Sequence, residues 1–173
     1  MPFADFLKTA VLLFAASATA LAVVALASGS ARDEPALLYF AGGWWLVAAL
    51  IGSVAGRRLK PTAGTARLMA GARSTTTMPE IDPGSVIFAR LWGLGALTLV
   101  ASGVAFLFPQ VPAVGAGYSL LLALAWRRQA AAVEAVEGRD GMRFYVEPGS
   151  PLKPASLVRT PWLRREEALE QAA

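Results

Sequence analysis

Four long apolar stretches, almost free of ionisable side chains, constrain this chain more than any other feature. They cover about residues 9–27, 36–55, 87–108 and 113–126. At a rise of about 1.5 Å per residue, a helix of about 20 apolar residues crosses the ~30 Å hydrocarbon core of a bilayer. Only 16% of the residues are charged, whereas a soluble domain carries about 25%. The sequence therefore predicts an all-α integral membrane protein with four transmembrane helices, arranged as two helical hairpins.

The predicted organisation has two parts. Residues 1–128 form a four-helix transmembrane domain that includes a cytoplasmic basic loop at 56–86, and residues 129–173 form a cytoplasmic C-terminal region. Only Pro109-Gln110-Val111-Pro112 separates the third stretch from the fourth, so these two return antiparallel to each other. The fourth stretch is short. It fits a bilayer with little tilt, or with Arg127 and Arg128 at its end reaching the headgroups.

The first stretch has two readings, a retained span or a cleaved signal peptide. Ala25-Leu26-Ala27 has the small-x-small form of a cleavage site. Against this, the preceding region holds only Lys8, offset by Asp5, and the apolar run exceeds the usual length of about 7 to 15 residues. These flanks favour retention, with cleavage as the alternative.

The distribution of positive charge predicts the orientation. If the amino terminus is cytoplasmic, 15 of the 16 lysines and arginines lie on the cytoplasmic side and only Arg32 lies outside. This asymmetry is the usual topology signal of membrane proteins. We therefore expect both termini in the cytoplasm and a multi-pass protein of the plasma membrane. The abundance of Ala and Arg is typical of bacteria, where this would be the cell inner membrane.

Trp44 and Trp45 lie near the middle of the second stretch, away from the interfacial depth that tryptophan prefers. Their indole N–H groups need acceptors, which in hydrocarbon must come from another helix or from a wet cavity. This face of the second span is therefore predicted to pack on protein.

The C-terminal region alternates between helical and extended patterns. Strong helix formers predict that the fourth helix continues into water as far as Glu137, and Gly138-Arg139-Asp140-Gly141 then stops it. Residues 142–147 have the two-residue period of a strand. Its predicted partner is the Thr-rich segment 74–78, or the same strand in a second copy. Residues 148–154 are too rich in proline for regular structure, and residues 164–173 are predicted to be a short helix.

The absence of cysteine and histidine excludes many activities. Thiolate or imidazole metal sites, haem ligation through histidine, disulfides and histidine-based nucleophile pairs all need these residues. The carboxylates Glu134, Glu137, Asp140 and Glu147 could serve acid–base chemistry, but arginines are interspersed among them, which favours a compensated surface. We predict no catalytic, cofactor or metal site. The positive net charge reflects topology, and nucleic-acid binding is not expected because no recognition motif accompanies it.

Basic residues form the first candidate site, as contacts to anionic lipid at the cytoplasmic ends of two spans: Arg57, Arg58, Lys60, Arg127 and Arg128. Each contributes about 1 kcal/mol near an anionic surface, although orientation signals explain them equally well and are preferred. Within the spans, only Arg90 is ionisable. Its place near the cytoplasmic end favours an anchor reaching the headgroups over a gating or substrate-binding charge.

Small residues form a second candidate set, for close helix packing: Gly52, Gly56, Gly93, Gly95 and Gly117. The four-residue spacing of the first two lets helices approach closely. Packing within the chain is favoured over a homodimer seam. The third set comprises candidate contacts to a protein partner in the tail: Phe144, Tyr145, Val146, Arg159 and Trp162. Its mixture of apolar and basic side chains suits a headgroup surface or a partner's groove.

Three functions are compatible with these features. The leading prediction is a non-catalytic accessory, assembly or interaction subunit that docks through its cytoplasmic loop and tail, on a protein partner or on a second copy. The alternative is an oligomeric channel or facilitator for a small solute or ion, lined by Ser17, Thr19, Ser102 and Ser119. An enzyme acting on lipid headgroups through the cytoplasmic carboxylates is the least favoured.

Overall fold

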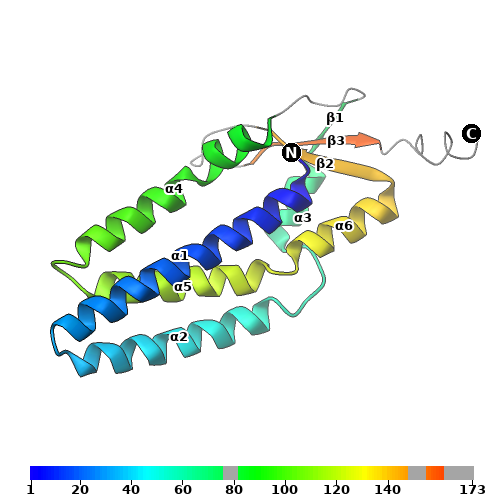
Figure 1. The fold of residues 1–173 in the computed structure, drawn as a ribbon. Coiled ribbons are helices and arrows are strands. Elements are labelled where there is room, and N and C mark those ends of the chain that lie inside the picture. Colours follow the sequence, from blue (N-terminus) through cyan, green and yellow to red (C-terminus); the bar gives the residue numbers. More distant parts are fainter. Residues whose placement is uncertain (76–81, 148–154, 162–173) are drawn as a thin grey trace, which may run out of the picture.

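The chain folds into a helical bundle with a small mixed cap at one end (Figure 1). The structure is a computed structural model, and it describes residues 1–75, 82–147 and 155–161. The elements, in chain order, are α1 (Phe3–Ala31), α2 (Pro35–Ala55), α3 (Ala63–Ala70), β1 (Arg73–Ser74), α4 (Pro83–Val104), α5 (Gln110–Trp126), α6 (Gln129–Asp140), β2 (Met142–Val146) and β3 (Leu157–Pro161).

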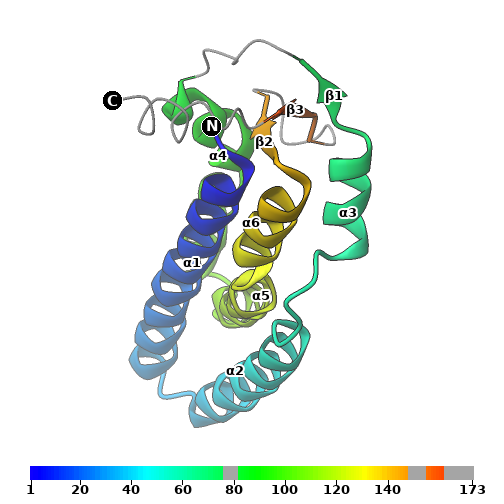
Figure 2. The ribbon, with the colours of Figure 1, turned by 90° about the vertical axis from the view of Figure 1, so that its right-hand side faces the viewer.

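The bundle consists of α1, α2, α4 and α5, with α5 in contact with the other three. Figure 2 shows α5 enclosed between α1 and α2, with α4 on the far side. The turn from α1 to α2 is tight because Asp33 adopts a left-handed conformation (φ 51°) and Pro35 starts the next helix. Arg32 in this turn donates to the carbonyl of Phe106, just after the end of α4, and so links the two hairpins at the end opposite the cap.

In the part of the chain that the structure describes, three helices are long and apolar enough to cross a membrane: α1 with 29 residues, α2 with 21 and α4 with 22. These are the properties of a multi-pass membrane protein. α1 extends beyond the predicted span 9–27 at both ends. At its start, Lys8 pairs with Asp5 at 3.6 Å on one face of the helix. The two charged residues are therefore compatible with the helix, which begins before them. α5 is shorter, with 17 residues.

The cap combines α3, α6 and a three-stranded sheet in the order β1-β3-β2. The strand predicted at 142–147 is confirmed as β2, but its predicted partner is wrong. β2 pairs antiparallel with β3, and the Arg73–Ser74 strand pairs parallel with the opposite edge of β3. The pairing of β2 with β3 was not predicted, because the proline-rich residues 148–154 gave no sign that the chain returns to β2. Residues 148–154 and residues 76–78 of the predicted partner lie outside the described residues.

The helix predicted to continue from α5 into water is interrupted. α5 ends at Trp126, and α6 starts afresh at Gln129. α6 then passes through Gly138 and ends only at Asp140, because Gly141 takes a left-handed conformation (φ 63°) that glycine adopts without strain.

The first turns of α1 belong to the cap. The carbonyl of Met1 accepts from the N–H of Val146 at 3.0 Å, and Pro2 forms a bridge with Tyr145 at the free edge of β2. The cap core therefore draws on both ends of the chain, through Met1, Phe3, Ala4, Leu7, Met69, Ala72, Val86, Ala130, Val133, Phe144, Val146 and Leu157. A domain boundary at residue 128 stays a prediction.

Candidate functional site

Small residues fill the interior of the bundle, whereas large apolar residues cover its outside. Beside the buried Leu21 and Leu37, the small buried positions include Ala25, Ala41, Ala48, Gly52, Ala113, Ala116, Gly117 and Ala123. On the surface, Leu99 is 75% exposed and Phe106 is 83% exposed, and many other large side chains of these helices are also exposed. A protein folded in water would bury such residues. Helices in hydrocarbon gain nothing from burying them and pack through small residues instead.

Three hydroxyl groups meet at the centre of the bundle. The hydroxyl of Ser17 on α1 lies 2.7 Å from that of Thr98 on α4 and 3.4 Å from that of Ser119 on α5. Ser17 and Ser119 are buried. Of the other predicted pore residues, Thr19 donates to the carbonyl of Ala15 and Ser102 to that of Thr98. These hydroxyls therefore join helices or bond to their own helix.

Trp44 and Trp45 connect α2 to α5. The indole N–H of Trp44 donates to the carbonyl of Val114 at 3.2 Å, and that of Trp45 donates to Ala113 at 2.8 Å. The predicted need for acceptors on another helix is thus confirmed. Gly117 makes this possible, because a Cβ at that position would overlap the Trp44 indole.

The other candidate glycines fall into two pairs. Gly52 and Gly56 lie against the backbone of α5, where a Cβ at Gly52 would meet the Leu121 carbonyl at 2.7 Å and one at Gly56 would overlap the Leu124 carbonyl. Together with Gly117, they bring α2 and α5 into close approach. Gly93 and Gly95 on α4 have open space, with no atom within 4 Å of an added Cβ.

The predicted lipid-contact residues gather where α2 and α5 end beside the cap. Arg57, Arg58, Arg127 and Arg128 are exposed, and the guanidinium of Arg128 donates to the carbonyl of Arg57 at 3.0 Å. Arg58 and Lys60 also line a cavity of about 510 Å³ with Val54, Ala55, Pro61, Thr62, Ala63 and Gln129. This cavity was not predictable from the sequence, because it depends on where α6 places Gln129.

The predicted partner-contact residues lie mostly in the cap core. Phe144, Tyr145 and Val146 are buried by the chain itself. Arg159 is half-buried and donates to the hydroxyl of Ser74 at 2.7 Å, which joins β3 to β1. Trp162 lies outside the described residues. In this fold a partner would meet the first three only if the cap opened, so their predicted role stays a prediction.

Each of three cap carboxylates has a structural partner. Glu134 pairs with Lys8 of α1 at 2.7 Å, and Asp140 pairs with Arg139. Glu137 is buried and accepts from the N–H of Phe144 at 2.9 Å. Burial raises the pKa of Glu137, while the hydrogen bond from Phe144 and the charge of Arg143 oppose the rise. The contacts of Glu134 and Glu137 fasten α6 to α1 and to β2, whereas the Asp140 pair lies within α6.

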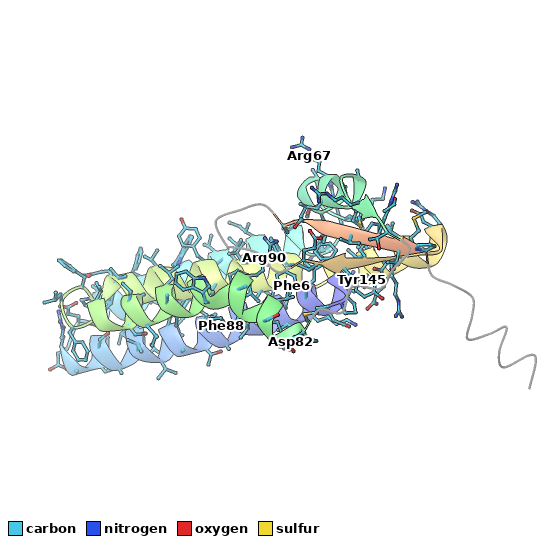
Figure 3. The ribbon with its side chains drawn as sticks, turned by 90° about the horizontal axis from the view of Figure 1, so that it is seen from above. Phe6, Arg67, Asp82, Phe88, Arg90 and Tyr145 are labelled. Carbon is cyan, nitrogen blue, oxygen red and sulfur yellow. The ribbon has the colours of Figure 1, made fainter. Side chains whose placement is uncertain are left out.

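Arg90 joins α4 to the cap. Its guanidinium donates to the carbonyl of Glu147 at 3.1 Å, and Figure 3 shows Arg90 between α4 and the sheet. The predicted anchor to the headgroups thus has a contact within the protein. The signal for this role was the position of a lone arginine near a helix end, but the sequence did not identify the acceptor.

No family model, curated protein or solved structure matches the chain. Within residues 1–75, 82–147 and 155–161, no group of three metal-ligating side chains could hold a metal ion.

Proposed function

We propose that the chain is a small four-span membrane protein with a cytoplasmic cap, acting as a non-catalytic accessory, assembly or interaction subunit. The observation that carries the proposal is the contrast between the two ends of one fold. The bundle exposes large apolar side chains, as a lipid-embedded surface does. The cap instead buries its large apolar side chains in a core, as a domain surrounded by water does.

The packing of α5 supports a fourth crossing. This helix contacts α1, α2 and α4, and its buried face consists largely of Ala, Gly and Ser. Its 17 residues reach about 25 Å, so with Arg127 and Arg128 extending to the headgroups it nearly matches the bilayer. An even number of crossings places both ends of the chain on one side, in agreement with the shared cap. The role of Phe3 and Leu7 in the cap core favours retention of the first span.

The partners of the polar groups favour a structural over a catalytic role. Glu134 and Glu137 hold cap elements together, Asp140 pairs with Arg139 of its own helix, and the hydroxyls of Ser17 and Ser119 hold helices together. The hydroxyl contacts also weigh against the channel alternative, because these groups face one another across a helix interface.

The exposed cations of the cap supply a docking surface for a partner that presents carboxylates. Arg67 on α3 points away from the bundle (Figure 3), and Arg73 on β1 is also exposed. Opposite charge at such a surface steers association and selects partners.

The test uses the full chain in its native membrane, solubilised in mild detergent. We expect a defined partner in fixed stoichiometry by native mass spectrometry, lost in the double variant Arg67→Gln/Arg73→Gln. The matched control, Arg58→Gln/Lys60→Gln, removes two charges at the bundle end and should retain the partner. A lone wild-type monomer, or equal loss in both variants, would contradict the proposal.

A further inference from the structure

In the proposed membrane placement, the cavity at the end of α2 lies at the depth of the lipid headgroups. Val54 and Ala55 form its apolar side and belong to the last turn of a helix long enough to span the bilayer. The other residues that line it are Arg58, Lys60, Pro61, Thr62 and Ala63, on the path to the cap, and Gln129 at the start of α6. Because the cavity sits where the apolar helix gives way to the cap, a lipid can reach it from the membrane without leaving the interface.

The charged residues that line this cavity are all positive. Arg58 and Lys60 supply two cations, and no carboxylate is among its described lining residues. Within the described part of the chain, neither cation forms an ion pair. α3 and α6 both begin at this cavity, with Ala63 and Gln129, and helix starts carry partial positive charge. An anion bound by Arg58 and Lys60 would therefore also be attracted by the two helix starts.

The wall of the cavity is fixed before any ligand arrives. The buried side chain of Gln129 accepts from the N–H of Thr62 at 3.0 Å and donates to the carbonyl of Lys60 at 3.3 Å. These two bonds hold the Lys60–Thr62 segment against the start of α6. A preorganised wall lowers the entropic cost of binding.

The size and the mixed lining indicate the kind of anion. A volume of about 510 Å³ lies within the ~300–1,000 Å³ range of small-molecule sites. A free inorganic anion needs only charge, whereas Val54 and Ala55 offer apolar surface beside the cations. A phospholipid has a phosphate for the cations and carbon atoms for the apolar surface.

We propose that this cavity binds the phosphate headgroup of an anionic phospholipid, with Arg58 and Lys60 contacting the phosphate and Val54 and Ala55 contacting the carbon atoms next to it. The bound lipid would brace the segment between α2 and α3. The inference depends on the proposed membrane placement, and it is independent of a protein partner.

The test measures lipid binding to the purified full chain by native mass spectrometry, with phosphatidylglycerol against phosphatidylcholine as probes. We expect preference for phosphatidylglycerol, with its dissociation constant raised about 30-fold in Arg58→Gln/Lys60→Gln, since each basic residue near the surface contributes about a factor of five. The charge-conserving variant Arg58→Lys/Lys60→Arg should stay within about threefold of the wild type.

The matched control, Arg67→Gln/Arg73→Gln, loses the same charge away from the cavity and should change binding less than about twofold. Equal losses in both neutralised variants would mean diffuse attraction and would overturn the proposal. Inorganic phosphate that displaces the lipid at equal concentration would overturn the choice of a lipid ligand. Because the same two variants have opposite expected effects on the protein partner, failure of one proposal is distinguishable from failure of the other.

Discussion

The bundle and the cap are stabilised by different side chains, although α1 runs through both. In the cap, Phe3, Leu7 and Phe144 belong to one continuous buried cluster. In the bundle, residues such as Ala41 and Ala116 lie inside, and the contacts between helices include hydroxyl and indole hydrogen bonds. One chain can thus follow two packing rules, because the solvent of each part decides which contacts are favourable.

The largest effect should follow removal of a large side chain from the cap. Phe144→Ala is expected to lower the free energy of unfolding of the cap by about 3–5 kcal/mol, the usual cost of truncating a buried phenylalanine. Hydrogen exchange in detergent should then accelerate in β2 and β3 while α2 and α5 keep their protection. Tyr39→Ala, at an exposed position of α2, is the control and should alter neither region. Equal loss of protection in the bundle would contradict separate packing.

A methyl group added between helices should destabilise the bundle instead of the cap. Gly56→Ala is expected to cost about 1–3 kcal/mol in the bundle, because its Cβ would overlap the carbonyl of Leu124. Unfolding measured by steric trapping in bicelles checks this. Gly93→Ala, where the added carbon meets no atom within 4 Å, is the matched control and should change stability by less than about 0.5 kcal/mol. Similar costs at both positions would refute the assigned α2–α5 contact.

The pH dependence of the cap should depend on Glu137. Burial raises its pKa, helped by nearby Glu134 and Asp5 and opposed by the Phe144 N–H and Arg143. The folded state therefore holds the proton more tightly than the unfolded state. Its contribution to the free energy of unfolding should rise as the pH falls through the raised pKa toward the ordinary value of 4.5.

The variant Glu137→Gln isolates this contribution. Glutamine keeps an oxygen that can accept from Phe144 but does not titrate. The slope of the free energy of unfolding against pH, from pH 7 down to the ordinary value of 4.5, should therefore lose the contribution of Glu137. Glu137→Ala instead leaves the Phe144 N–H without its acceptor and should cost about 1–3 kcal/mol at pH 7. An unchanged slope in the glutamine variant would show that Glu137 is not the titrating group.

The smallest effect should come from a single hydrogen bond in the bundle. Trp45→Phe removes the bond to the Ala113 carbonyl and should cost about 1 kcal/mol. Steric trapping again measures it, and Trp92→Phe, at an exposed position of α4, is the control. A cost no larger than that of the control would mean that the indole bond does not stabilise the bundle.

Local pattern predicted the parts of the fold that depend on local chemistry. Length and apolar composition predicted the long helices, and alternation predicted the strand at 142–147, because these signals lie within each segment. The mid-span position of Trp44 and Trp45 indicated a helix contact for the same reason: an indole N–H requires an acceptor wherever it is buried.

Pairings between distant segments were not predictable. Nothing in residues 1–7 indicates that Met1 and Pro2 extend the sheet beside β2. Residues 157–161 gave a surface-like pattern because Arg159 interrupts their apolar side chains, although they form the central strand. The cavity at Arg58 and Lys60 likewise depends on Gln129, about 70 residues later in the chain, and only the fold brings them together.

Site-directed labelling tests the proposed four crossings and the proposed cytoplasmic location of the cap most directly. The chain has no cysteine, so single variants Glu34→Cys, Arg67→Cys, Gln110→Cys and Arg139→Cys can be labelled with a membrane-impermeant maleimide without background. We predict that positions 67 and 139 react only from the cytoplasmic side, and positions 34 and 110 only from the opposite side. Labelling of position 139 together with 34 and 110 would mean that α5 does not cross, and reaction of all four from one side would contradict the membrane placement itself.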